Sequence, residues 1–356
     1  MRSVRRTLLA TVFTLAVTCA SAQTSSIVVD PGAGPITASR SPCLIAHLTK
    51  RDECPEPRLL SDNSAPADRV ASRLARASYY VDIQEIEKAL VETDAALAID
   101  PDYTPARHLA ARLSMVLGDG ERAQRDAFLA RKHAPDDPAI RTTYAIALQG
   151  RQANAESFTE LTAIIKANPR FLFAREQRAE LLMRASFFDN MAFQYAVALE
   201  DYNYVIENGE TTANLFASRA RAFRGAGRPD SAAADLSSAL KLEPDRYDLL
   251  TARADAYVGA QLDELAVKDF DVLLAMTAGS PLYAMSDGDR ASLLAKRAGA
   301  LVRLRQFEKA TDDIVAALSA GGQSAVLRAQ VFLRSNGFSD VVLDGKNSPA
   351  LRAAIS

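Results

Sequence analysis

The sequence contains few of the residues that usually form a chemical site. It has no tryptophan, three cysteines and three histidines among 356 residues. No Gly-x-Ser-x-Gly sequence occurs, and no histidine has a second histidine or a carboxylate at metal-binding spacing. The sequence therefore predicts no catalytic residue, no metal site and no cofactor. A hydrolase or transferase is the least favoured functional class.

The chain also lacks a large excess of either charge, and it lacks long apolar runs. The formal net charge is -2, and no cluster of lysine and arginine occurs in the body of the chain. We therefore expect no nucleic-acid partner. After residue 22, no stretch is long and apolar enough to cross a bilayer, so we expect no transmembrane segment once the first residues are removed.

The first 22 residues have the features of a cleaved signal peptide. Arg2, Arg5 and Arg6 precede a short apolar core from Leu8 to Val17. The tripeptide Ala20-Ser21-Ala22 fits a small-residue cleavage site. We expect export, which makes the mature protein periplasmic or secreted.

Residues 23–69 form a lead segment in which Pro, Gly, Ser and Thr are frequent and no helical period is visible. Export to an oxidising compartment favours a disulfide between Cys43 and Cys54. Closing that loop would stabilise the segment by about 2–3 kcal/mol. A metal site shared with His47 is the alternative, but it would lack a fourth ligand.

Alanine is abundant, and its placement follows an internal repeat. Pro101, Pro135 and Pro169 lie 34 residues apart, and this period divides residues 70–324 into seven units. The units start near residues 70, 104, 138, 172, 213, 247 and 291, with insertions inside the fourth unit and before the last one. Each unit is long enough for two helices and a turn.

Two positions of the repeat carry small residues. Position 8 holds Ala77, Ala111, Ala145, Ala179, Ala220, Ala254 and Ala298. Position 20 holds Ala89, Ala123, Ser157, Ala198, Ala232, Ala266 and Ala310. Because small side chains let two helix backbones approach closely, we expect these positions to mark the crossing of the two helices in each unit.

Further features of the repeat belong to a known family. They are Arg-Ala in the first helix, an aromatic at Tyr80, Phe223 and Tyr257, and closing stretches such as Ala-Ile-Asp-Pro at 98–101 and Leu-Glu-Pro-Asp at 242–245. In these features residues 70–324 resemble the tetratricopeptide repeat (TPR) family. The resemblance implies an all-α, right-handed superhelical solenoid of about seven helix-turn-helix units. It also implies a concave groove, lined by the first helices, that binds a protein or peptide.

Arginine at position 7 recurs together with an acid at position 23. The pairs are Arg76 and Glu92, Arg178 and Asp201, Arg219 and Asp235, Arg253 and Asp269, and Arg297 and Asp313. The second and third units have Ala110 and Tyr144 at position 7 instead. Because cation and acid occur together, we predict charge-assisted hydrogen bonds between the two helices of a unit. An anion-binding strip is the alternative.

Positions 2, 5, 9 and 12 of each first helix are expected to line the groove. They include His108, Arg112, Thr142, Glu176, Glu180, Arg221, Arg224, Thr251 and Asp255. The signs alternate along this series, which suits an extended peptide of mixed charge. The alternative is an ordinary solvated face. The Lys and Asn pairs with which family members clamp a terminal carboxylate are absent at the matching positions, so we do not predict that type of ligand.

The fourth unit contains an unusual number of aromatic residues. They are Phe187, Phe188, Phe193, Tyr195, Tyr202 and Tyr204. They could anchor a partner. The alternative, which we favour, is that they fill the space created by the insertion in this unit.

Residues 325–356 do not continue the repeat. A helix is expected to end at Gly337, a turn follows at Leu343-Asp344-Gly345, and Ser348-Pro349 starts a last short helix. This order resembles small peptidoglycan-binding modules, whereas a plain cap over the last repeat is the alternative. The sequence thus favours an exported, non-catalytic interaction scaffold in the cell envelope. The second hypothesis is a peptidoglycan-associated binding protein whose repeats act as a spacer.

Overall fold

The computed structural model describes residues 56–184, 190–209, 211–277, 286–335 and 339–355. Over these residues the chain forms helices and no strand, which confirms the predicted all-α class. It divides into two compact units, residues 1–191 and 192–356, here called the N-terminal body and the C-terminal body. The predicted signal peptide and the residues Cys43, His47 and Cys54 lie outside the described residues.

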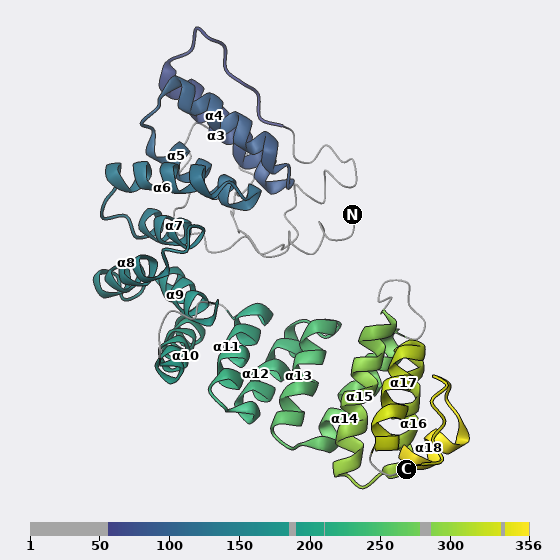
Figure 1. The fold of residues 1–356 in the computed structure, drawn as a ribbon. Coiled ribbons are helices and arrows are strands. Elements are labelled where there is room, and N and C mark those ends of the chain that lie inside the picture. The colour runs from purple at the N-terminus through teal and green to yellow at the C-terminus, as the bar shows by residue number, and fades with distance from the viewer. Residues whose placement is uncertain (1–55, 185–189, 210, 278–285, 336–338, 356) are drawn as a thin grey trace. The chain divides into compact units, whose positions relative to one another are not determined.

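The N-terminal body is a series of helix pairs (Figure 1). Its helices are α3 (Pro66–Asp82), α4 (Ile86–Ile99), α5 (Thr104–Leu117), α6 (Gly120–His133), α7 (Pro138–Gln149), α8 (Asn154–Ala167) and α9 (Leu172–Arg184). The first and second helices of a pair pack together, and each second helix packs on the next first helix. This alternation is the pattern expected of a stacked repeat.

The C-terminal body continues the same alternation. Its helices are α10 (Met191–Asn208, in this body from Ala192 onward), α11 (Ala213–Gly225), α12 (Pro229–Leu242), α13 (Tyr247–Gly259), α14 (Asp263–Thr277), α15 (Asp287–Arg303), α16 (Phe307–Ala320), α17 (Gly322–Ser335) and α18 (Pro349–Ile355). Among the helices described in the two bodies, none is both long and apolar enough to cross a membrane.

The 34-residue period is visible in where the first helices begin. Helices α5, α7, α9, α11 and α13 begin at Thr104, Pro138, Leu172, Ala213 and Tyr247, which are the unit starts expected from the sequence. Helices α3 and α15 begin four residues earlier than expected. Pro66 occupies the first position of α3, and the Ser286 hydroxyl accepts the N–H of Asp289 at the start of α15. Both are helix-initiating residues, so they move the start of the helix upstream.

The small residues at positions 8 and 20 lie inside the helix pairs. All fourteen are at most 2 % exposed. In the third unit the two positions touch directly, because the Ser157 hydroxyl on α8 donates a 2.7 Å hydrogen bond to the Ala145 carbonyl on α7. Larger apolar groups close the space around these crossings, for example Leu161 and Ile164 in the N-terminal body and Phe270 in the C-terminal body.

One backbone feature recurs in the turn between the two helices of a unit. The residue fourteen places after the unit start has a positive φ: Gln84 (63°), Gly118 (80°), Gln152 (62°), Gly227 (70°), Gln261 (59°) and Arg305 (59°). This conformation costs little for glycine but about 1–2 kcal/mol for other residues. Four of the six turns are therefore strained by their side chain.

The residues after α16 form a small structure of their own at the end of the C-terminal body. Val326, Val341 and Leu351 make a buried cluster, and α17 and α18 both pack on α16. The buried Gln330 amide holds the Asp344-Gly345 turn. It donates to Asp344 Oδ1 and to the Lys346 carbonyl, both at 2.9 Å, and accepts the Gly345 N–H at 2.8 Å.

Candidate functional site

In the C-terminal body, each arginine at position 7 bonds to the acid at position 23 of its unit. Each guanidinium donates two hydrogen bonds to one carboxylate. The distances are 2.8 and 2.7 Å for Arg219 and Asp235, 2.8 and 2.8 Å for Arg253 and Asp269, and 2.7 and 2.6 Å for Arg297 and Asp313. All three carboxylates are buried. These are desolvated bidentate pairs, the strongest type of side-chain ion pair.

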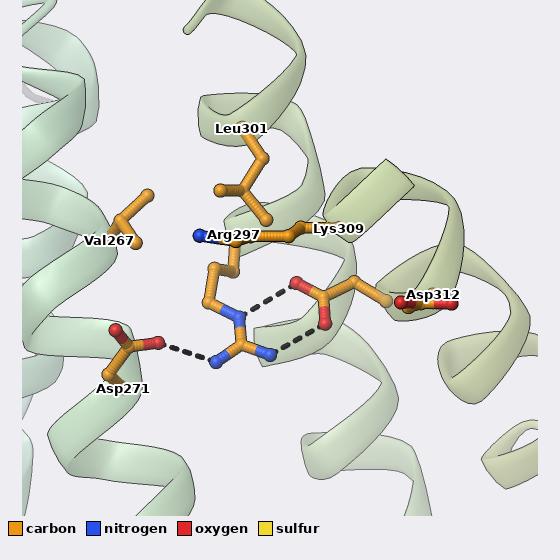
Figure 2. A pocket seen from close by; sticks show the side chains of 7 residues that line it. Val267, Asp271, Arg297, Leu301, Lys309 and Asp312 are labelled. Carbon is orange, nitrogen blue, oxygen red and sulfur yellow. Dashed lines mark hydrogen bonds and ion pairs between the residues drawn. The ribbon is translucent and has the colours of Figure 1, made fainter. Parts of the chain in front are cut away.

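Each of these arginines also donates a bond to the preceding unit. The Nη1 atoms reach Asn203 Oδ1 at 2.9 Å, Ser237 Oγ at 3.4 Å and Asp271 Oδ1 at 2.6 Å. Figure 2 shows Arg297 held in this way between α14 and α16. The arginines thus join two helices of one unit and two successive units. Because their donors are engaged, this favours the structural interpretation over an anion-binding strip.

A pocket of about 320 Å³ lies beside Arg297 (Figure 2). Its walls include the apolar Val267 and Leu301 and the charged Lys309 and Asp312. Hydrogen bonds to Asp313 and Asp271 raise the pKa of Arg297, so the guanidinium remains charged and bound to them. The pocket therefore combines both signs of charge around an ion pair that is already complete, and it has no feature that selects a ligand.

In the N-terminal body, the arginine that bonds to the acid at position 23 stands mostly at position 4, one helical turn before position 7. Arg73 donates to Glu92 at 2.8 Å, Arg107 to Asp126 at 2.6 Å and Arg141 to Glu160 at 2.9 Å. The sequence reasoning missed all three, although they recur at the 34-residue period. Positions 4 and 7 lie on the same face of a helix, so either can reach the acid on the second helix.

In the first and fourth units, the arginines at position 7 have other partners. Arg76 Nε lies 3.5 Å from Glu92, and its guanidinium also pairs with Glu56 of the lead segment. Arg178 donates to Thr162 Oγ1 at 3.2 Å, the same type of bond to the preceding unit that is seen in the C-terminal body. Its predicted partner Asp201 belongs to the other body, and this pair stays a prediction.

Three residues expected to line the groove are buried in the N-terminal body. His108 and Arg112 are only 9 % and 8 % exposed, and Thr142 is fully buried. His108 Nε2 lies 2.7 Å from Thr143 Oγ1, which joins α5 to α7. Burial lowers the pKa of His108 to about 3 and that of Arg112 to about 10. The expectation that these side chains face an open groove is wrong here, because neighbouring first helices pack directly on one another.

Glu176 and Glu180 lie one turn apart on α9 and are half-buried. Burial, and to a lesser extent the charge of Glu180, raise the pKa of Glu176 to about 7. No further residue of the described chain completes a metal site with them, because no group of three or more potential ligands is found there.

The C-terminal body presents its first helices differently. Helices α11, α13 and α15 are joined mainly through α12 and α14 rather than directly to each other. Arg221 and Arg224 on α11 are exposed, and Thr251 and Asp255 on α13 are half-buried. The Lys296 ammonium on α15 donates to both oxygens of Asp255, at 2.8 and 2.9 Å. We call these five residues the α11–α15 face. Lys296 is a member that the sequence reasoning missed.

Comparison with solved structures identifies the fold of the chain. No family model and no curated protein matches the chain in sequence. Among solved structures, PilW, a widely conserved type IV pilus biogenesis factor, is similar with a TM-score of 0.53 and 19% identity, over 60% of this chain and 96% of that chain. The C-terminal part of a TPR repeat-containing protein from Cytophaga hutchinsonii has a TM-score of 0.51 and 15% identity, over 68% and 92%. The chain has the TPR fold.

The complex Cut9–Hcn1 of the APC/C is similar at the same level, with a TM-score of 0.51 and 15% identity, over 69% of this chain and 45% of that chain. The TPR fold accounts for the small residues at the crossings and for the alternation of first and second helices. It does not by itself define a ligand, because one fold can present different surfaces.

The aromatic residues of the fourth TPR unit are distributed between the interior and the surface. Tyr202 is fully buried, whereas Phe193 is exposed. A Cβ atom added to Gly225 would lie 2.4 Å from the ring of Tyr195, so glycine is needed for this ring to pack against α11. These contacts favour space filling for Tyr195 and Tyr202. Phe187 and Phe188 lie outside the described residues.

Proposed function

We propose that this chain is a non-catalytic scaffold that holds a protein or peptide partner on the α11–α15 face. The observation that supports the proposal is that some arginines of the first helices bond to neighbouring helices whereas others are exposed. The position-7 arginines are engaged in bonds between helices, whereas Arg224 at position 12 of α11 is exposed. An exposed charged group on a first helix can complement the charge of a partner.

The test is site-specific photo-crosslinking in cells. A photoreactive amino acid at Thr251 is expected to give a discrete adduct with a protein partner. The matched control replaces Arg125, which is exposed on the second helix α6 and should give no adduct. The absence of an adduct at Thr251, or the same adducts at both positions, would reject the α11–α15 face as the binding surface.

The proposed location is the cell envelope, and it depends on the signal-like residues 1–22. We expect the chain in the periplasmic or secreted fraction with this segment removed. Deletion of residues 2–22 should leave the protein in the cytosolic fraction. A full-length chain that stays cytosolic with residue 1 intact would contradict export but not partner binding.

A second candidate function, peptidoglycan binding, is favoured by the C-terminal segment. The Gln330 amide organises the Asp344-Gly345 turn, and this arrangement is separate from the repeats. Pelleting with purified peptidoglycan tests it. Val342→Asp/Leu343→Asp, at two exposed apolar positions, should reduce pelleting, whereas Val91→Asp on α4 should not. If the unaltered protein does not pellet, the segment is a cap over the last unit.

A further inference from the structure

The segment just before α3 takes the place that a second helix has elsewhere in the array. At four junctions, the position-7 arginine of one unit donates to a side-chain oxygen at position 25 of the preceding second helix. The acceptors are Thr162, Asn203, Ser237 and Asp271. On α3 the equivalent arginine is Arg76, and its guanidinium pairs with Glu56, which lies outside any helix. Glu56 thus provides the acceptor that a preceding second helix provides at the other junctions.

Residues 56–60, here called the strap, are held at one end by a closed set of hydrogen bonds. The Tyr80 hydroxyl donates to Glu56 Oε1 at 2.6 Å. Arg76 donates to that hydroxyl at 3.0 Å and also to the carboxylate. One turn earlier, Arg73 makes the short bond to the acid at position 23, at 2.8 Å. The guanidinium of Arg76 is therefore directed mainly at the strap.

The rest of the strap is held weakly on α3. Pro57 and Leu59 are half-buried whereas Arg58 and Leu60 are exposed, as expected of an extended segment with one side on a surface. The Leu60 N–H group donates to the Ser72 hydroxyl at 3.5 Å, which is long for a hydrogen bond. The side chain of the anchoring glutamate is 42 % exposed, and exposed ion pairs contribute little stability. The strap can therefore open while α3 stays folded.

We propose that the strap is an autoinhibitory contact. It covers the site on α3 that suits a second helix, and its release lets a helix of a partner protein dock there. The four junctions define the chemistry of that partner, an amphipathic helix with a side-chain oxygen directed at Arg76. Asp271 makes the shortest of the four bonds, at 2.6 Å, so the partner helix carries Asp or Glu at this place. This site lies in the N-terminal body and goes beyond the function proposed for the α11–α15 face.

The probe is a fluorescent peptide with the sequence of α14, the helix that presents Asp271 to Arg297. A lactam between Glu264 and Lys268, which are exposed and four residues apart, keeps the short peptide helical. Fluorescence anisotropy with the full chain measures its dissociation constant. We expect weak binding to the unaltered chain, because only the fraction of molecules with an open strap can bind.

Three variants of the chain test the strap. Glu56→Lys places a second cation beside Arg76, which opens the strap and should tighten probe binding about tenfold. Tyr80→Phe removes one bond of the strap without changing any charge, and it should tighten binding about two- to threefold. The matched control Asp136→Lys makes the same charge change at an exposed position between α6 and α7. It should change the dissociation constant less than about twofold.

Two altered probes test the contact with Arg76. Asp271→Ala in the peptide should weaken binding to the Glu56→Lys chain about fivefold or more, because it removes the acceptor. Asp263→Ala removes the same charge at the first residue of the peptide and should change binding less than about twofold. Equal losses for the two probes would mean a general attraction between charges, and the proposal would be wrong.

Three further results would overturn the proposal. Equal probe affinity of the unaltered and Glu56→Lys chains would show that the strap does not inhibit. If neither chain binds the probe, α3 is not a docking site for a helix. If sedimentation velocity shows that the Glu56→Lys chain self-associates without the probe, the occupant of α3 is a second copy of this chain.

Discussion

The two bodies of this molecule solve the same packing problem with different residues. In the C-terminal body, the arginine at position 7 binds the acid on the second helix with two hydrogen bonds and the preceding unit with a third. In the second and third units, the arginine at position 4 makes that contact with fewer bonds, as Arg107 does with Asp126. The acid at position 23 is therefore the constant part of the repeat, whereas its arginine partner stands either at position 7 or one turn earlier at position 4.

The bodies differ in their first helices as well. In the N-terminal body α5 and α7 pack together and bury His108 and Arg112, whereas α11 and α13 are separated by α12 and leave Arg221 and Arg224 exposed. Side chains at equivalent repeat positions are core residues in one body and surface residues in the other. Whether a first-helix position faces a groove thus depends on how closely the neighbouring first helices pack.

The largest expected effect tests the arginines that bond to the acids at position 23. Arg253→Ala leaves Asp269 buried without its bidentate partner, and we expect a loss of about 3–5 kcal/mol. Arg107→Ala should cost about 1–2 kcal/mol, because Arg122 Nε stays 3.4 Å from Asp126. Hydrogen exchange of α13 and α14, compared with α5 and α6, measures both losses. Equal losses would remove the distinction between the bodies.

The second prediction tests what the bodies share. Ala123→Leu in α6 and Ala232→Leu in α12 place a large side chain at the same fully buried crossing. Each should destabilise its own body by about 1–3 kcal/mol through overpacking. Urea titration followed by hydrogen exchange of each body would show the two costs. A tolerated substitution in only one body would mean that its helices cross less closely.

A pH dependence is expected in the N-terminal body. The pKa of His108 is lowered to about 3 in the folded chain, so the unfolded state binds more protons below its ordinary pKa of 6.5. Its contribution to stability is present above pH 6.5 and is lost as the pH falls toward 3. Between pH 7 and pH 5 the loss is about 1–2 kcal/mol.

The control for this prediction is His108→Gln, which cannot titrate. The raised pKa of Glu176 acts in the opposite direction, since its folded carboxyl binds a proton that the unfolded one releases between pH 4.5 and about 7. Both proteins keep this contribution, so the difference between them isolates His108. Parallel stability curves for the two proteins between pH 7 and pH 5 would show that His108 is accessible to water.

The smallest effect concerns the turns. Gln261→Gly relieves a side chain held at a φ of 59° and should stabilise the C-terminal body by about 0.5 kcal/mol. The gain is this small because the larger conformational entropy that glycine loses on folding offsets part of the relieved strain. Gly227→Gln, at the equivalent position with a φ of 70°, should destabilise it by about 1 kcal/mol. Thermal melts measure both changes. A lower melting temperature for Gln261→Gly together with a higher one for Gly227→Gln would contradict the argument.

Much of the fold could be predicted from the sequence because the repeat is local. A 34-residue period with alanine at position 8 requires close helix crossings, and Ala77 and Ala254 are fully buried as that requires. Arg219 and Asp235 could be paired because their spacing recurs in other units. Arg107 recurs at position 4 with Arg73 and Arg141, so the same reasoning could have found it. Lys296 could not be assigned, because its side chain is long and can reach several acids from neighbouring helices.

The sequence alone determined the helices, their turns and the small residues at which they cross, because these depend on contacts within one unit. Only the tertiary structure decided which first-helix residues are buried, since this depends on how closely α5 approaches α7 and on what lies between α11 and α13. It also decided that Lys296 neutralises Asp255, a contact between residues 41 positions apart. The charge that a partner meets is therefore a property of neighbouring units together.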